Sequence, residues 1–203
     1  MIKKTVLIPL KQEFFNRKTV TVARELLGKI LVKNYNNSIL TGRIVETEAY
    51  LGDSDPACHA YGKITKRNEV LFEKPGTIYV YFIYGNYFCF NVVTEQEGVG
   101  SAVLIRAVEP IQGIDTFKKR RNFLKDIYNL TNGPAKLSMA FGFNLKDNRK
   151  DITGGEIFIA ADSTKVKFEI EISERIGLNK GTEFPYRFFI KGNRFVTKHK
   201  FNK

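Results

Sequence analysis

The sequence has few of the residues from which metal centres, redox sites and disulfide frameworks are built. It contains no tryptophan, and only two cysteines, two histidines and two methionines among 203 residues. Cys58 and Cys89 are too few for a disulfide framework and suit a reducing compartment. His59 and His199 stand far apart, so they lack zinc-ligand spacing. Walker and G-x-G-x-x-G loops are missing too, and we expect neither a metal nor a cofactor.

Long apolar runs are also missing. No stretch approaches the roughly 18 apolar residues of a membrane span, and the opening MIKKTVLIPLKQEFF has too short an apolar run for a signal peptide. We therefore expect no membrane association. Hydrophobic residues at 43% and charged residues at 27% are typical of globular proteins, which excludes a largely disordered chain. No repeat or low-complexity linker divides it, so residues 1–203 are predicted to form one domain.

Acidic residues are fewer than basic residues, with 21 Asp and Glu against 33 Lys and Arg. The formal net charge is +12, divided as +3 over residues 1–110 and +9 over residues 111–203. A basic domain of this kind is attracted to polyanions. Residues 68–110 run against the trend with a local charge of −3, and residues 186–203 hold six cations and no acid. We therefore expect basic residues in the second half of the chain to bind a phosphate backbone.

Hydrophobic patterning predicts an α+β fold on a mainly antiparallel sheet. Segments rich in valine, isoleucine, tyrosine and phenylalanine predict strands over 29–34, 39–51, 77–84, 87–94, 102–108, 156–160, 166–171 and 186–197. Helices are predicted over 19–29, 112–129 and 134–143, the last with Pro134 in its first turn.

An aromatic hairpin is the first candidate functional feature. The segment GTIYVYFIYGNYFCFNVVT (76–94) places Gly85 and Asn86 between two β-prone arms, with Tyr84 and Tyr87 beside the turn. One interpretation is a buried hairpin whose tip packs beneath a loop. The other is a wedge, because a planar side chain on a rigid ribbon can enter a base step and unstack it.

The second candidate functional feature is a pair of glutamates on another predicted strand. In RIVETEAYL (43–51), strand alternation places Glu46, Glu48 and Tyr50 on one face. The residues are compatible with an edge strand that has a wet face, or with a carboxylate acting as a general base in a cleft. Arg106 is a single charge inside the apolar strand AVLIRAVEP, and pairing with a carboxylate explains it most simply.

Five blocks match a known family in order and at suitable spacing. They are RIVETEAYLG (43–52), the following His59, KPGTIYVYFIYGNYFCFN (74–91), VLIRAVEP (103–110) and GPAKL (133–137). Together with weaker likeness in RIGL (175–178) and PYRFFIKG (185–192), the chain resembles the alkyladenine (3-methyladenine) DNA glycosylases. The resemblance implies one catalytic domain, a curved antiparallel sheet with surrounding helices and a protruding hairpin.

The resemblance also implies a reaction. A monofunctional enzyme of this family flips a damaged purine from duplex DNA and hydrolyses its N-glycosidic bond in base excision repair. Glu48 matches the family's general base, which activates the attacking water, and Arg106 matches the arginine that helps hold that water. Glu46 has no counterpart with a role, and we interpret it as structural.

The remaining matches concern the base. Tyr84 matches the intercalating tyrosine that fills the vacated stack. Tyr50, His59 and Tyr81 match the residues that sandwich and contact the flipped base, and Asn91 matches the asparagine that disfavours the guanine amino group. For Tyr81 and Asn91 to line one pocket they must share a face, so we predict a three-residue loop over Gly85 to Tyr87, or an equivalent bulge, that pairs Tyr81 with Asn91.

Two rival functions use the same residues differently. A bifunctional glycosylase/lyase would need an amine nucleophile, for which Lys136 in GPAKL is the best placed lysine, although packing or phosphate contact suits it better. A non-enzymatic nucleic-acid-binding module would use the tyrosines as a stacking platform but has no use for Glu48. The run Lys118 to Arg121 is interpreted first as a solvated helix face and second as a phosphate contact.

The expected partner is double-stranded DNA that contains damaged purines, bound by a monomer. We expect the protein at the nucleoid in the cytoplasm if it is bacterial, and in the nucleus if it is eukaryotic. The candidate lesions are 3-methyladenine, 7-methylguanine, hypoxanthine and ethenoadenine.

Overall fold

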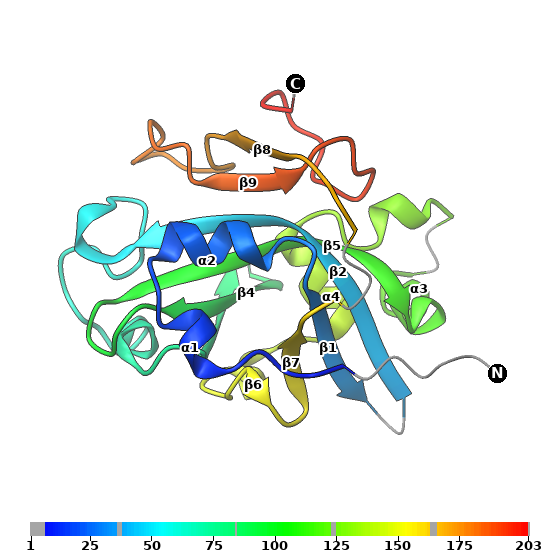
Figure 1. The fold of residues 1–203 in the computed structure, drawn as a ribbon, viewed down its shortest axis with the longest axis horizontal. Helices are drawn as coiled ribbons and strands as arrows, with labels where there is room; N and C mark the ends of the chain where they lie inside the picture. The colour runs from blue at the N-terminus through cyan, green and yellow to red at the C-terminus, as the bar shows by residue number, and fades with distance from the viewer. Residues whose placement is uncertain (1–6, 36–37, 84, 123–124, 163–165, 203) are drawn as a thin grey trace.

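A curled antiparallel sheet joins the strands of the molecule (Figure 1). The computed structural model describes residues 7–35, 38–83, 85–122, 125–162 and 166–202. The main path of the sheet runs β3-β4-β5-β2-β1-β7-β6, and β9 pairs with both β2 and β8. The strands are β1 (Ile30–Tyr35), β2 (Ser38–Leu51), β3 (Ile78–Ile83), β4 (Tyr87–Thr94), β5 (Ser101–Gln112), β6 (Thr153–Gly154), β7 (Ile157–Ala160), β8 (Ile170–Ser173) and β9 (Arg187–Ile190). The α+β prediction is confirmed.

Strand β2 occupies the middle of the sheet. One of its sides pairs with β5, and the other pairs first with β1 and then with β9. The prediction of an edge strand with a wet face is therefore wrong, because Glu46 and Glu48 are fully buried. The register with β5 skips Val45 on β2 and Arg106 on β5, as β-bulges do.

The register between β2 and β5 brings their charged side chains together. Because Thr47 opposes Ile105 and Glu46 opposes Ala107, the extra residue Arg106 also lies opposite Glu46. Leu104 opposes Glu48, and Arg106 lies two residues further along β5, so strand alternation places its guanidinium on the glutamate face of β2.

Helices cover both faces of the sheet (Figure 1). They are α1 (Gln12–Phe15), α2 (Thr19–Leu26), α3 (Ile114–Arg120) and α4 (Pro134–Phe141), with 3₁₀ turns η1 (Gly52–Ser54), η2 (Glu69–Phe72), η3 (Ile127–Asn129) and η4 (Leu145–Asp147). Helix α2 buries Val22, Ala23 and Leu26, and the carbonyl of Ala23 accepts a 2.8 Å hydrogen bond from the Thr47 hydroxyl. The α2 side of β2 is thus apolar core, and Glu46 and Glu48 face the other side.

Some predicted elements end differently. The helix predicted over 112–129 stops at Arg120, because Asn122 takes a left-handed φ of 57°. The helix predicted over 19–29 ends at Leu26, and the strands predicted over 166–171 and 186–197 are Ile170–Ser173 and Arg187–Ile190.

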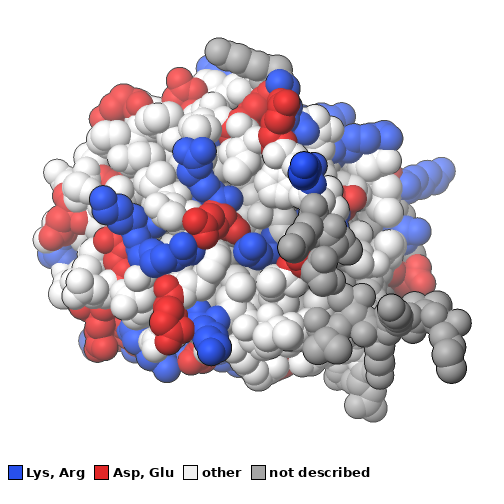
Figure 2. Space-filling model, in the orientation of Figure 1, with Lys and Arg blue, Asp and Glu red and all other residues white. Residues whose placement is uncertain are grey.

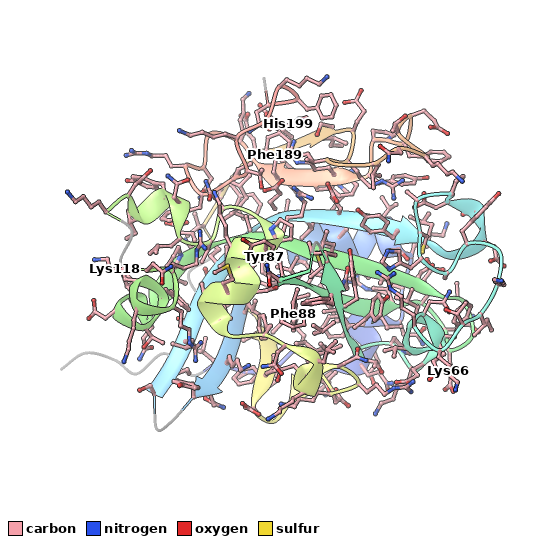
Figure 3. The ribbon with its side chains drawn as sticks, turned by 180° about the vertical axis from the view of Figure 1, so that it is seen from behind. Lys66, Tyr87, Phe88, Lys118, Phe189 and His199 are labelled. Carbon is pink, nitrogen blue, oxygen red and sulfur yellow. The ribbon has the colours of Figure 1, made fainter. Side chains whose placement is uncertain are left out.

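The basic run of α3 is partly structural. The Arg120 guanidinium donates to the carbonyl of Ala140 and lies 4.2 Å from the Tyr35 ring centroid, and Arg121 Nε donates to the carbonyl of Leu130. Both arginines therefore hold neighbouring segments, which corrects the interpretation of the whole run as a solvated face. Figure 3 shows Lys118 on the outer side of α3. No helix in the described part of the chain is long and apolar enough to span a bilayer.

Candidate active site

An aromatic pocket opens between the hairpin β3–β4, the end of β2 and the loop around His59. Its volume is about 70 Å³. The four residues predicted to contact a flipped base, Tyr50, His59, Tyr81 and Asn91, all line it. The remaining lining residues are Ala57, Cys58, Leu71, Tyr79, Ala102 and Leu178. A slot with tyrosine and histidine walls is suited to a flat ring.

The hairpin register differs from the prediction by two residues. Ile83 pairs with Tyr87, so the loop holds three residues, 84 to 86, and neither the predicted Gly85–Tyr87 loop nor a two-residue turn forms. Tyr81 lies opposite Cys89, and Tyr79 lies opposite Asn91, so the predicted pairing of Tyr81 with Asn91 is wrong. Tyr87 continues its strand, as an aromatic residue favours, and Gly85 takes the left-handed φ of 72° that the loop needs.

The error leaves the pocket intact. Strand side chains alternate with a period of two, so a shift by two residues preserves the face on which each one lies. Tyr81 and Asn91 therefore share the pocket side of the hairpin with Tyr79. The Asn91 amide donates a 3.0 Å hydrogen bond to the carbonyl of Tyr79, which fixes its side chain at the pocket wall.

His59 is fixed by the two hairpin tyrosines. Its Nδ1 lies 3.0 Å from the Tyr79 hydroxyl, and its ring centroid lies 4.5 Å from that of Tyr81. Burial, and then the nearby Arg67, lower the pKa of His59, so the imidazole is neutral at neutral pH. Burial raises the pKa of Tyr79 to about 12 and that of Tyr81 further, so both phenols stay protonated.

The Glu48 carboxylate lies directly behind the pocket wall. Its Oε2 accepts a 2.8 Å hydrogen bond from the Tyr50 hydroxyl, and its Oε1 accepts one of 2.8 Å from the main-chain N–H of Ile176. Arg106 Nη1 lies 3.2 Å from the same Oε1. Burial and the adjacent Glu48 raise the pKa of Tyr50 well above its usual value, so Tyr50 remains the donor. Glu48 is therefore held in one orientation by three groups.

Behind Glu48 lies a second buried carboxylate. Glu46 Oε1 accepts hydrogen bonds from Arg106 Nε at 3.0 Å and from Arg187 Nε at 2.7 Å. Burial alone would raise the pKa of Glu46, but the two arginines and Thr197 hold it below its ordinary value. Burial disfavours charge on Arg106 as well, yet the two glutamates raise its pKa. The site thus combines two carboxylates with two guanidinium groups.

The wall residue Tyr50 is supported from behind by an ion pair. The Arg175 guanidinium lies 4.6 Å from the Tyr50 ring centroid and donates to both carboxylate oxygens of Asp55, to Oδ1 at 2.8 Å. Arg175 Nη1 also donates to the carbonyl of Ala49 at 2.8 Å. These contacts fix the plane of the ring that faces the pocket.

The hairpin tip projects into solvent. Phe82 is 46% exposed and Tyr87 is 38% exposed, and the Phe82 and Phe88 ring centroids are 5.3 Å apart. Figure 3 shows Tyr87 and Phe88 on this ribbon. The interpretation that the tip packs beneath a loop is therefore wrong. The predicted wedge residue, Tyr84, lies outside the described residues.

The lysine considered for lyase chemistry is engaged elsewhere. Lys136 Nζ donates to Asn132 Oδ1 at 2.8 Å, and burial followed by Arg121 lowers its pKa. Among the described residues that line the pocket there is no lysine. The described residues also contain no group of three histidine, cysteine or acidic side chains placed to hold a metal ion. Cys58 and Cys89 are free, and burial raises the pKa of each thiol to about 11.

Comparison with known proteins decides the family. The model of the methylpurine-DNA glycosylase family matches residues 13–194. A protein of Carboxydothermus hydrogenoformans is 48% identical over 190 residues, which cover 93% of this chain and 98% of that protein. The chain belongs to the methylpurine-DNA glycosylase family. It is therefore a DNA repair enzyme that hydrolyses N-glycosyl bonds, and the alternative of a non-enzymatic binding module is wrong.

Two further bacterial relatives extend the match to this glycosylase. A protein of Francisella tularensis subsp. tularensis is 49% identical over 185 residues, covering 89% of this chain and 94% of its own. One from Clostridium perfringens is 46% identical over 202 residues, covering 93% and 98%. All three relatives carry the words 3-methyladenine DNA glycosylase in their names.

Sequence reasoning missed several residues that hold the glycosylase site together. They are Asp55, Tyr79, Arg175, Ile176, Arg187 and Thr197. Ile176 contributes only a main-chain N–H, for which a side-chain pattern gives no signal. Arg187 did carry a signal, because it is a charge beside the apolar run FFI, as Arg106 is within its own strand.

Proposed function

We propose that this glycosylase flips an alkylated or deaminated purine out of duplex DNA and hydrolyses its N-glycosidic bond with a water that Glu48 activates. The observation that carries the proposal is the fully buried carboxylate of Glu48 directly behind the Tyr50 wall of an aromatic slot. A carboxylate is costly to bury without partners, and the three donors around Glu48 supply those partners and fix its orientation. The names of the relatives support 3-methyladenine as one substrate.

The chemistry follows from that carboxylate. As the bond between C1′ and the base nitrogen breaks, its electron pair leaves with the base and positive charge develops on the sugar. Water oxygen attacks C1′ and its proton passes to Glu48. A cationic alkylated purine leaves as the neutral base, whereas a deaminated purine leaves as an anion that takes up a proton from solvent, and in both cases the products are the free base and an abasic site. Arg106, whose Nη1 lies 3.2 Å from Glu48 Oε1, helps to hold the water.

The pocket supplies selectivity. Alkylation at a ring nitrogen makes the purine cationic, and stacking between tyrosines favours a cation by about 0.5–2 kcal/mol per contact. Tyr50, His59 and Tyr81 form the walls of the slot, and the fixed Asn91 amide disfavours the exocyclic amino group of guanine. Flipping costs a few kcal/mol and is cheapest at damaged bases, which adds selectivity before the chemistry.

The hairpin supplies the wedge. In the sequence Tyr84 stands between Ile83 and Gly85, and the exposed aromatic residues Phe82 and Tyr87 lie nearby, so we assign to Tyr84 the space that the flipped nucleotide leaves. The protein would act on damaged double-stranded DNA as a monomer. Its relatives are bacterial, which favours the bacterial nucleoid as its place of work.

Base release from defined duplexes tests the mechanism. Each duplex holds one 3-methyladenine, 7-methylguanine, hypoxanthine or ethenoadenine. Replacing Glu48→Gln should lower the single-turnover rate by about 10²–10⁴-fold, the range for a missing general base, with little change in DNA affinity. Glu25→Gln is the matched control, since Glu25 forms an exposed ion pair with Arg17. Full activity in Glu48→Gln would refute the mechanism.

Borohydride trapping distinguishes the lyase alternative from the monofunctional mechanism. A Schiff base formed by an amine is reduced by borohydride to a stable protein–DNA adduct. The monofunctional mechanism predicts no adduct with either the native chain or Lys136→Gln. An adduct that disappears in Lys136→Gln would establish the lyase and overturn the water mechanism.

A further inference from the structure

The chain beyond residue 194 lies outside the stretch that the family model matches, yet it is built into the protein. Phe195 and Val196 are buried in the main core. The Phe195 ring centroid lies 5.0 Å from that of Tyr128, and the Arg194 guanidinium lies 3.5 Å from the same Tyr128 ring. This anchor fixes the start of the segment Thr197–Asn202, which we call the C-terminal segment.

The first residue of the C-terminal segment contacts the buried carboxylate behind Glu48. The main-chain N–H of Thr197 donates a 2.8 Å hydrogen bond to Glu46 Oε2. The other oxygen, Oε1, is taken by Arg106 and Arg187. Thr197 is therefore the donor that completes the hydrogen bonding of Glu46, and it contributes to the low pKa of that carboxyl.

The last residue of the segment holds the second arginine. Asn202 Oδ1 accepts a 2.9 Å hydrogen bond from Arg187 Nη2, and Asn202 Nδ2 donates one of 2.9 Å to the carbonyl of Thr197. The segment is thus closed on itself around Arg187. Figure 3 shows His199, from the middle of the segment, above Phe189 of β9.

These contacts reach the catalytic carboxylate through one guanidinium. Arg106 Nε is bound to Glu46, and Arg106 Nη1 faces Glu48 Oε1. A planar guanidinium fixed at one edge has its other edge fixed as well. The orientation of Glu46, which Thr197 and Arg187 set, therefore determines where Arg106 meets Glu48.

We propose that the C-terminal segment is a positioning element of the active site, in which the Thr197 N–H and the Asn202 side chain hold Glu46 and Arg187 so that Arg106 is aligned on Glu48. The proposal rests on the role of Glu48 given above. It assigns to Glu46 a function in alignment, which the sequence did not reveal.

Thr197→Pro tests the proposal, because proline removes the donated N–H. Thr197→Val keeps that N–H and removes only the hydroxyl. With methylated duplex DNA and enzyme in excess, the single-turnover rate of release of 3-methyladenine should be about tenfold lower in Thr197→Pro than in Thr197→Val, the kinetic equivalent of one missing hydrogen bond. Affinity for undamaged duplex should be the same in both.

A pH profile distinguishes positioning from general damage. Without the Thr197 donor, Glu46 takes up a proton at higher pH and releases Arg106, so the acid limb of the rate should move to higher pH in Thr197→Pro. Asn202→Leu should lower the rate in the same direction, and it serves as the deciding variant if Thr197→Pro does not unfold cooperatively. Equal rates in Thr197→Pro and Thr197→Val, or an unchanged rate in Asn202→Leu where proline prevents folding, overturn the proposal.

The rival explanation is that the segment contributes only charge. In that case Lys198→Gln and Lys200→Gln would lower the rate as much as Thr197→Pro, and low salt would restore it. That result also overturns the proposal. If instead Glu48→Gln is fully active, the proposed function fails, whereas an inactive Glu48→Gln beside a fully active Thr197→Pro rejects only the positioning role.

Discussion

Glu46 and Glu48 lie two residues apart on one strand, yet their surroundings give them different tasks. Glu46 is bound by two arginines and a main-chain N–H, so it is satisfied without any external ligand. Glu48 has one arginine, one main-chain N–H and a tyrosine that itself lines the pocket. Only Glu48 is therefore linked to the space where a base would sit.

Stability at low pH depends on Glu46. Its pKa is lowered in the folded protein, so it contributes stability above the unfolded value of about 4.5 that is lost as pH falls through the folded pKa. Glu46→Gln breaks a buried network and should lower the free energy of unfolding by about 3 kcal/mol at pH 7. Urea unfolding from pH 7 to pH 3 should show that the difference in free energy of unfolding between the native protein and Glu46→Gln becomes smaller. A constant difference would contradict the lowered pKa of Glu46.

The pKa of His59 gives a second prediction for a single residue. Burial and Arg67 both lower its pKa, so Arg67→Gln should raise the His59 midpoint toward 6.5. Proton NMR can follow both histidines of the chain, with His199 as the internal reference. Lys66→Gln is the matched control, because Lys66 is an exposed neighbour that does not contribute to the shift. An equal shift in both variants would show that Arg67 has no specific effect.

At the scale of elements, the hairpin carries the aromatic residues and the central strands carry the charged residues of the candidate site. The hairpin β3–β4 places pocket residues on one face of its base and exposed aromatic residues at its tip. Strands β2 and β5 carry the charged groups, and their register brings Arg106 to the face of β2 that carries Glu46 and Glu48. The hairpin proposed to contact DNA is thus joined to the strands that carry the proposed catalytic groups.

Two glycines test the role of the tip. Gly85 and Gly155 both have positive φ, 72° and 81°, and an added Cβ meets nothing within 4 Å at either. Gly85→Ala and Gly155→Ala should each lower the free energy of unfolding by about 1 kcal/mol through backbone strain. Only Gly85→Ala, which alters the loop that carries Tyr84, should weaken binding to a lesion-containing duplex. Equal binding by both variants would argue against the tip as the wedge.

Across the whole molecule, most of the net positive charge lies in a different part of the chain from the aromatic hairpin. On the face shown in Figure 2, cations and carboxylates are intermingled. The net charge of +12 is carried mostly by residues 111–203, whereas residues 68–110 around the hairpin carry −3. The DNA backbone is therefore expected to be held at some distance from the residues that examine the base.

Salt dependence measures how the protein holds that backbone. Binding to undamaged duplex should weaken as salt rises, and the double variant Lys198→Gln with Lys200→Gln should reduce the log–log slope by about 0.9 for each phosphate that these two lysines neutralise. Lys74→Gln is the control, because Lys74 is paired with Asp151. A flat salt response of the native protein would exclude this role for its basic residues.

Local patterns predicted much of this molecule, and long-range partners account for what they missed. Alternation placed Glu46, Glu48 and Tyr50 on one face, and the strands containing Tyr81, Asn91 and Arg106 were identified directly. The hairpin register was wrong because three consecutive turn residues allow several closures that differ by one or two positions.

The partners of the glutamates come from far along the chain. Ile176 lies 128 residues after Glu48, and Thr197 lies 151 residues after Glu46. Periodicity acts over a few residues and carries no information on such pairings, which arise only when distant segments of the chain meet in the folded protein.

The pairing of β2 on both sides has a consequence for how the enzyme opens. At Glu46, Thr47 and Glu48 the strand is paired to β5 on one side and to β9 on the other. Amide protons there should exchange with solvent only when the whole domain unfolds, whereas those at the exposed hairpin tip should exchange through local fraying. In the proposed mechanism, the carboxylate that activates water would therefore lie in the part that opens last, and the part that meets DNA would be the one that opens first.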